Sequence, residues 1–188
     1  RAGSGSDRIN VGDGDNVVNA GDGNNSVSAG RGDDRVSTGR GNDNVNAGDG
    51  DNRVSTGSGN DRVTTGRGDD SINGGRGSDA ISAGSGDNAI NAGSGNNSVA
   101  AGNGDDTVRA GSGSDRISVG DGDNVVNAGD GNNSVSAGRG DDRVSTGRGN
   151  DNVNAGGGDN AINAGGGNNS VAAGNGDDTV RAGSGSDR

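Results

Sequence analysis

The chain has 188 residues and a formal net charge of −11, with 45 glycines and no Pro, Cys, Met or aromatic residue. His, Lys and Glu are also missing, which removes most acid–base and nucleophilic side chains and the usual ligands of zinc, haem and iron–sulfur centres, so we expect no enzyme. The acidic balance favours cations over nucleic acid as partners, and no apolar run is long enough to predict membrane insertion.

A nine-residue repeat begins at Ala2 and continues without insertion, giving twenty complete units and a twenty-first that stops at Arg188. We number the positions of each unit 1 to 9. Positions 2 and 4 are always Gly, position 6 is always Asp or Asn, and position 8 is always Val or Ile. Val and Ile make only 24 of the 188 residues, which is too few for a conventional globular core, so we expect a repeat architecture.

Each unit predicts a tight turn followed by a short strand. Two glycines separated by one residue permit a turn with positive φ, and positions 7 to 9 form a strand whose β-branched position 8 points inward. In chain order we expect turns at 3–7 and 12–16, strands at 8–10 and 17–19, and the same elements every 18 residues up to the end of the chain. Two units then close one flattened coil, and stacked coils bury a thin ladder of Val and Ile.

Position 5 supports the 18-residue coil, because it is Asp in every even-numbered unit and Asn or Ser in every odd-numbered unit. The turns of the even-numbered units form one row, which we call the even row, and the turns of the odd-numbered units form the opposite odd row. Roughly ten coils stacked at about 4.8 Å per strand spacing predict a rod about 50 Å long.

Position 6 alternates between Asp and Asn from coil to coil, with Asp61 as the exception, and position 3 places alternating charges on one edge, as at Asp13 and Arg31. This 36-residue period keeps like charges from facing each other across neighbouring strands. Duplication of a 36-residue cassette explains the period equally well, because residues 110–155 repeat residues 2–47 with a single change.

The unit resembles the glycine-rich nonapeptide of the RTX (repeats-in-toxin) family, written G-G-x-G-x-D-x-U-x with U a large aliphatic residue. The resemblance covers essentially the whole chain, in which G-x-G-x-[DN]-x-[VI] recurs twenty times. It implies an all-β fold, a right-handed parallel β-roll or β-helix solenoid of about ten coils, with calcium as cofactor and partner. In that family the position-6 Asp and the turn carbonyls of two successive coils enclose each ion, and such hard oxygens are the ligands that Ca²⁺ prefers.

Carried over to this chain, the resemblance implies metal ligands at the position-6 aspartates, which are Asp7, Asp34, Asp43, Asp61, Asp70, Asp79, Asp106, Asp115, Asp142, Asp151, Asp178 and Asp187. The even row adds a second candidate set at position 5, which is Asp15, Asp33, Asp51, Asp69, Asp87, Asp105, Asp123, Asp141, Asp159 and Asp177. A column of carboxylates about 5 Å apart repels itself unless a cation intervenes. We therefore expect calcium occupancy to be stronger on the even row, with Asn and Ser hydrogen-bond ladders holding part of the odd row. A metal-free solenoid laddered by Asn and Asp is the alternative.

Residues 1–8 recur as residues 109–116 and 181–188, and neither end carries a polar cap. We expect 1–188 to be a single uncapped array that is a slice of a longer repeat region, or that associates end to end into fibres. The expected role is an extracellular or cell-surface structural rod, such as a secreted stalk, adhesin spacer or filament, which the millimolar calcium outside cells would fold. A scaffold that binds ice, a glycan or a host receptor is the alternative, and a consensus-engineered repeat stays open.

Overall fold

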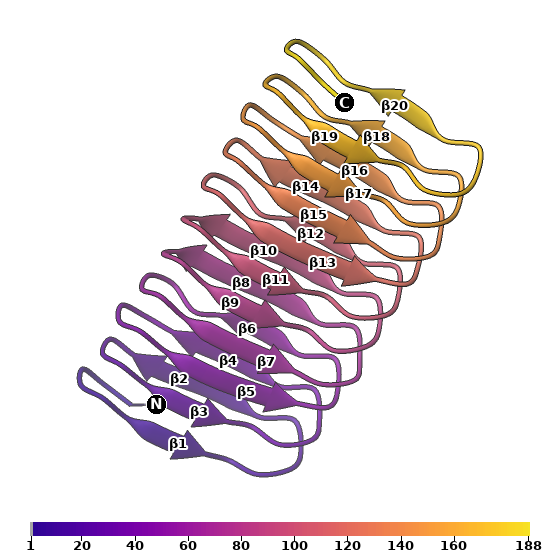
Figure 1. Ribbon diagram of the computed structural model, residues 1–188. Coiled ribbons are helices and arrows are strands. Elements are labelled where there is room, and N and C mark those ends of the chain that lie inside the picture. The colour runs from indigo at the N-terminus through magenta and orange to yellow at the C-terminus, as the bar shows by residue number, and fades with distance from the viewer. Residues whose placement is uncertain (1) are drawn as a thin grey trace.

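The computed structural model describes residues 2–188, and within them the chain forms twenty strands and no helix. The chain alternates between the two faces of a flattened solenoid, and its N-terminal and C-terminal coils lie at opposite ends of the stack (Figure 1). Strands of odd number make one ten-stranded sheet and strands of even number make the other. All pairings within both sheets are parallel, as the sequence predicts.

The two sheets are built from very short strands, most of three to five residues. The sheet of the odd-numbered units contains β1 (Arg8–Asn10), β3 (Ser26–Ser28), β5 (Asn44–Gly48), β7 (Arg62–Thr65), β9 (Ala80–Ser82), β11 (Ser98–Ala100), β13 (Arg116–Gly120), β15 (Ser134–Ala137), β17 (Asn152–Asn154) and β19 (Ser170–Ala172). The sheet of the even-numbered units contains β2 (Val17–Gly21), β4 (Arg35–Thr38), β6 (Arg53–Ser55), β8 (Ser71–Arg76), β10 (Ala89–Ser94), β12 (Thr107–Arg109), β14 (Val125–Gly129), β16 (Arg143–Thr146), β18 (Ala161–Asn163) and β20 (Thr179–Arg181).

The register confirms the 18-residue coil. Ile9 of β1 pairs with Val27 of β3, and Val18 of β2 pairs with Val36 of β4, so positions 7 to 9 of each unit lie directly over the same positions in the next coil. This strand register holds from the first coil to the last, and it slips by one residue only at the ends of four strand pairs, as where Gly21 pairs with Thr38. The fold is therefore the all-β parallel solenoid of about ten coils that the sequence predicts.

The core is the predicted aliphatic ladder with a second column beside it. Position 8 is buried throughout the interior coils, with Val45 and Val108 0 % exposed, and position 1 is buried too, as at Ala47 and Ala110. Side chains alternate across a strand, so positions 7 and 9 face outward while position 8 and the next position 1 face the core. Burying each Val side chain contributes about 1.5–3 kcal/mol. The core thins at the last coil, where Val180 is 44 % exposed.

The turns are tight because glycine allows successive coils to approach closely. Gly104, at position 4, has φ +134°, and a Cβ added there would lie 2.6 Å from the carbonyl carbon of Gly86 in the coil below. No L side chain fits both the backbone angle and that space. Close stacking of turns in this way places the polar side chains of positions 3, 5 and 6 in three parallel columns.

Candidate cation sites in the turns

Positions 5 and 6 are adjacent in sequence, but their side chains lie on opposite sides of the turn backbone, one outside and one inside. In the even row, Asp69 at position 5 is exposed, whereas Asp70 at position 6 is only 1 % exposed. The same contrast recurs in every interior turn, whether position 6 is Asp or Asn. The two sets of candidate ligands are thus separated, with the position-6 set inside the turns and the position-5 set on the outer surface.

Position 6 forms a ladder that points one way along the rod. The backbone N–H of Asp61 donates to Oδ1 of Asp79 in the next coil at 2.8 Å, and the N–H of Asn52 donates to Oδ1 of Asp70 at 2.8 Å. An Asn accepts in the same manner, since the N–H of Asp34 donates to Oδ1 of Asn52 at 3.0 Å. Because Oδ1 makes the same bond in both residue types, the planar end group has the same orientation in Asp and in Asn.

Position 5 forms a second ladder that points the opposite way. The N–H of Asp87 donates to Oδ1 of Asp69 in the preceding coil at 2.8 Å, and the series is unbroken from Asp15 to Asp177. In the odd row Asn and Ser do the same, as where the N–H of Asn60 donates to Oδ1 of Asn42 at 2.7 Å. Position 5 is therefore a structural ladder in both rows, built from carboxylates in the even row and from amide and hydroxyl groups in the odd row.

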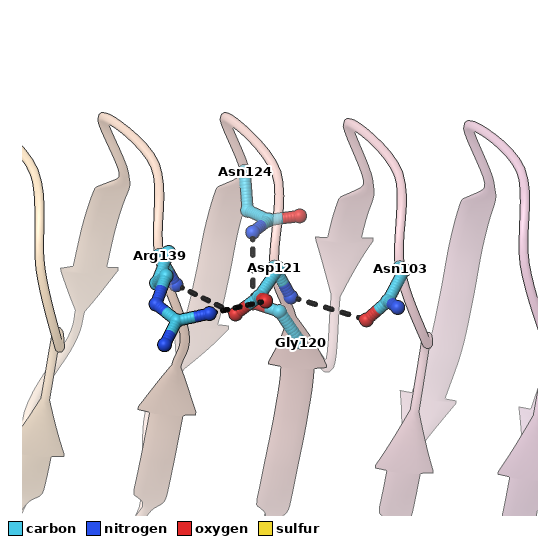
Figure 2. Close-up of polar contacts among 5 residues, drawn as sticks. All are labelled: Asn103, Gly120, Asp121, Asn124 and Arg139. Carbon is cyan, nitrogen blue, oxygen red and sulfur yellow. Dashed lines mark hydrogen bonds and ion pairs between the residues drawn. The ribbon is translucent and has the colours of Figure 1, made fainter.

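The second atom of the position-6 end group lies among backbone carbonyl oxygens. Where position 6 is Asn, this atom is Nδ2, and in Asn124 it donates to the Gly122 carbonyl at 2.8 Å. It also donates to the Gly120 carbonyl at 3.5 Å, which is the bond of Asn124 drawn in Figure 2. In Asn88 it donates to the position-4 carbonyl of Gly86 at 2.9 Å and to the position-1 carbonyl of Ala101, in the next coil, at 3.4 Å. The oxygens at positions 2 and 4 and the position-1 oxygen of the next coil thus form a cradle around this atom.

Where position 6 is Asp, the corresponding atom is Oδ2, which cannot donate to a carbonyl when the carboxylate is ionised. Among the residues that the structure describes, ten such oxygens are buried without any hydrogen-bond partner, and we call them orphan Oδ2 atoms. They belong to Asp7, Asp34, Asp43, Asp61, Asp70, Asp79, Asp106, Asp115, Asp142 and Asp151. A buried unpaired polar atom costs about 1–3 kcal/mol, and more when it is charged.

The electrostatics of the turns reflect this burial. Loss of hydration raises the pKa of six of these carboxyl groups above the ordinary value of 3.8, and these groups are Asp61, Asp70, Asp79, Asp106, Asp115 and Asp142. The carboxylate of Asp43 further raises the pKa of Asp61 in the next coil. A cation placed between the orphan Oδ2 atom and the carbonyl oxygens would remove both penalties.

The turns bring together one carboxylate and several carbonyls, and not a cluster of carboxylates. Across residues 2–188, no three acidic side chains gather into a metal-binding group. Any cation held here would take its remaining ligands from the backbone, and Ca²⁺ accepts carbonyl and carboxylate oxygens together in six- to eight-fold coordination. The donor set of the cradle, all hard oxygens, fits calcium.

Four threonines at position 1 also reach the cradle, and they are not among the candidate ligands expected from the sequence. Thr56 is 0 % exposed, and its Oγ1 donates to the Gly74 carbonyl in the next coil at 2.8 Å. Thr38, Thr65 and Thr146 make the same contact, and all four share a unit with an Asp at position 6. The Thr56 hydroxyl lies beside the Asp61 carboxyl group, but its single proton is used by the Gly74 carbonyl, so the orphan Oδ2 of Asp61 gains no donor.

Position 3 aligns its charges as the 36-residue period predicts, but backbone hydrogen bonds and not ion pairs hold them. Figure 2 shows the N–H of Arg139 donating to Oδ1 of Asp121 at 2.9 Å, and the N–H of Asp121 donating to Oδ1 of Asn103 at 3.4 Å. The Arg139 guanidinium lies 3.7 Å from Oδ2 of Asp121, and this exposed contact is the one ion pair found between residues 2 and 188. Such surface pairs stabilise a protein by about 0–1 kcal/mol.

In the part of the chain that the structure covers, no helix has the length and apolar character needed to cross a membrane.

A family model described as the RTX calcium-binding nonapeptide repeat matches residues 1–36, 28–63, 55–90, 82–117, 118–153 and 154–188, so that its matches together span the chain. No curated protein matches the sequence.

Proposed function

The chain belongs to the family of RTX calcium-binding nonapeptide repeats, and on that premise we propose that calcium bound in the turns stiffens a secreted structural rod. The solenoid and its repeats indicate a structural repeat protein. The ions are assigned to the cradles with Asp at position 6, in both rows of turns. The chemistry that calcium would supply there is charge: it compensates a buried carboxylate and several carbonyl dipoles at once.

The observation that carries this proposal is the set of orphan Oδ2 atoms. In the coil that contains Asp79, the ion would be held by the carboxylate of Asp79, the carbonyls of Gly75 and Gly77, and the Ala92 carbonyl of the next coil. Position 1 of that unit is close to both the Asp79 carboxylate and the Ala92 carbonyl, since a Cβ on Gly74 would lie 2.7 Å from Oδ2 of Asp79 and 2.8 Å from the Ala92 oxygen. An ion in this place joins two coils, so calcium would add stiffness along the rod axis.

The position-5 aspartates have a different part in this proposal. They are exposed, and their Oδ1 atoms are already used by the ladder. Their charge lies on the outside of the even row, where it attracts cations from solution without enclosing them. The odd row has seven of the twelve position-6 aspartates and the even row has five, so occupancy is not assigned preferentially to the even row.

An extracellular location fits the calcium requirement. Extracellular calcium modules bind with dissociation constants of about 10⁻⁴–10⁻³ M, which are met outside cells and not in the cytosol. A chain whose turns contain ten orphan carboxylate oxygens would be less stable at low calcium and would gain stability after export.

The ends of the array support the proposal of lengthwise association. All three residues of β20 are exposed, and Val180 leaves apolar surface open at the last coil. Unpaired strand edges pair readily with further strands. Further coils of the same repeat, on this chain or on a second copy, would continue both sheets in register.

Calcium titration of the chelator-treated protein tests the proposal. Isothermal titration should give saturable heat, and the thermal midpoint followed by circular dichroism should rise with calcium but much less with equal magnesium, which demands a smaller octahedral site. Light scattering in the same titration should report growth if coils stack between copies. Absence of heat and of any midpoint shift up to about 10 mM calcium would overturn the calcium role, because extracellular modules saturate below that concentration. A rod equally stable in chelator would instead support the metal-free ladder.

A further inference from the structure

We infer that Asn at position 6 is a built-in substitute for the ion, so that the chain encodes turn by turn which cradles bind calcium and which are closed by an amide. This inference rests on the proposed calcium role and deepens it. It predicts that the number of ions follows the position-6 aspartates, and that the Asn turns hold adjacent coils together without calcium.

The first support is the behaviour of the nine position-6 asparagines. Each of them donates from Nδ2 to at least one carbonyl of the cradle: Asn16, Asn25, Asn52, Asn88, Asn97, Asn124, Asn133, Asn160 and Asn169. The amide therefore puts a partial positive charge on the carbonyls where an Asp puts a negative one. Conversely, all the orphan Oδ2 atoms belong to aspartates at this same position, where no amide can donate to the carbonyls.

The second support is a pairing between positions 3 and 6 of the same turn. All five aspartates at position 3 occur in turns with Asn at position 6, as in the turn with Asp121 and Asn124. All six arginines at position 3 occur in turns with Asp at position 6, as in the turn with Arg139 and Asp142. No turn therefore carries a carboxylate at both positions, and a turn that has the buried carboxylate never has a second one at position 3.

The structure supplies a mechanism for this pairing. When position 3 is Asp, its Oδ1 accepts the N–H of position 3 in the next coil, as Asp121 does from Arg139. In turns with Ser, Arg or Gly at position 3, the N–H of position 3 in the next coil can instead go to the position-2 carbonyl, as where Arg76 donates to the Gly57 oxygen at 3.0 Å. An Asp at position 3 thus leaves the position-2 carbonyl available to the Asn amide (Figure 2). The position-2 carbonyl accepts a hydrogen bond from the Asn side-chain amide in all five turns with Asp at position 3. The asparagines of these turns are Asn16, Asn25, Asn52, Asn124 and Asn133.

The alternation also spaces the ions. In the even row Asn88 separates Asp70 from Asp106, so two ions in one row would lie two coils apart, about 9.6 Å instead of about 4.8 Å. Doubling the separation halves the repulsion between two divalent charges before screening. The odd row departs from this only at Asp43, Asp61 and Asp79, which follow one another in three successive coils.

Native mass spectrometry in calcium tests the inference, because it counts bound ions one by one. The triple substitution Asp70→Asn, Asp106→Asn and Asp142→Asn should lose three ions. The matched control carries Asp69→Asn, Asp105→Asn and Asp141→Asn, the exposed neighbours in the same three turns. It makes the same change in net charge and should lose none. The converse triple Asn88→Asp, Asn97→Asp and Asn160→Asp should gain three ions.

A variant in which all twelve position-6 aspartates are replaced by Asn should bind no calcium. Its circular dichroism should show the same β signal in chelator as in calcium. The inference would be overturned if the parent protein binds calcium but neither the Asp→Asn triple at position 6 nor the Asn→Asp triple changes the number of bound ions. That result would leave the proposed function standing. Loss of the fold in the all-Asn variant, with and without calcium, would also overturn it. A parent protein that binds no calcium would refute the proposed function itself, and the inference with it.

Discussion

The backbone N–H of Asp61 donates to Oδ1 of Asp79 in the next coil at 2.8 Å, and Oδ2 of Asp79 is one of the orphan atoms. The N–H of Asp43 donates to Asp61 in the same way, so three carboxylates stack in succession. Burial raises the pKa of both Asp61 and Asp79, and the neighbouring carboxylate raises each further. This stretch concentrates the electrostatic penalty of the calcium-free rod.

Replacing the middle carboxylate should therefore stabilise the rod in chelator. Asp61→Asn keeps the Oδ1 acceptor and replaces the orphan Oδ2 with a donor aimed at the cradle. We expect the calcium-free protein to gain about 1–3 kcal/mol, the cost of one buried unsatisfied polar group, measured as a higher urea midpoint in chelator. In calcium the same variant should bind one ion fewer than the parent protein, and its stability should rise little. Asp69→Asn, which changes an exposed carboxylate, is the control and should change the free energy of unfolding by less than about 0.5 kcal/mol. A fall in the midpoint of Asp61→Asn in chelator would contradict the assignment of its Oδ2 as uncompensated.

The fold could be predicted from the sequence because its information is local and periodic. Glycine at positions 2 and 4 and Val or Ile at position 8 specify turn and strand every nine residues, and the period at position 5 specifies two units per coil. The site was only partly predictable. Whether Asp69 or Asp70 enters the turn depends on backbone angles inside the turn, which residue identity alone does not reveal. The opposite directions of the two ladders and the carbonyl cradle around position 6 are likewise properties of stacked backbones and leave no mark in a single unit.

Turn glycines should differ sharply in their tolerance to alanine. Gly104→Ala places a Cβ 2.6 Å from the Gly86 carbonyl carbon at φ +134°, so the coil would have to separate locally. We expect a loss of at least about 1–3 kcal/mol from backbone strain alone, visible as a lower thermal midpoint and as faster amide exchange around this turn.

Gly157 is the matched control, because it occupies position 3 of a turn in the same row. Its φ lies outside the positive region, and the nearest atom to an added Cβ is the Asn175 oxygen at 4.0 Å. Gly157→Ala should be neutral or stabilise by up to about 1 kcal/mol by restricting the unfolded chain. Equal destabilisation by both substitutions would contradict the close approach of turn backbones.

The aliphatic ladder should behave as a packed core despite its thinness. Val108 is 0 % exposed and pairs in register with Ile90 and Val126 in the coils on either side. Val108→Ala removes two methyl groups and opens a cavity that rigid neighbouring coils cannot fill, so we expect a loss of about 2–3 kcal/mol in urea unfolding. Val17 is 77 % exposed at position 7, and Val17→Ala should change stability by less than about 0.5 kcal/mol. Similar losses for both variants would show that position 8 does not form the core.

Acidification should stabilise the rod in chelator and weaken it in calcium. Burial raises the pKa of Asp70, Asp106 and Asp142 in the folded state above 3.8, so the folded rod binds protons more tightly than the unfolded chain. Their stabilising effect is complete below the unfolded-state value and is lost as the pH rises through the raised folded-state pKa. In chelator the thermal midpoint should therefore rise as the pH is lowered from 7 towards about 4. In calcium the slope should reverse, because protons compete with the ion for the same carboxylates.

The net charge also becomes less negative on acidification, which stabilises the folded rod without any contribution from the cradle. The two Asp→Asn triples separate these effects, since they change the net charge equally. Substitution at Asp70, Asp106 and Asp142 should flatten the pH dependence in both solutions. Substitution at Asp69, Asp105 and Asp141 should leave the opposite slopes in place. Identical profiles for the two triples would place the titrating groups outside the cradles.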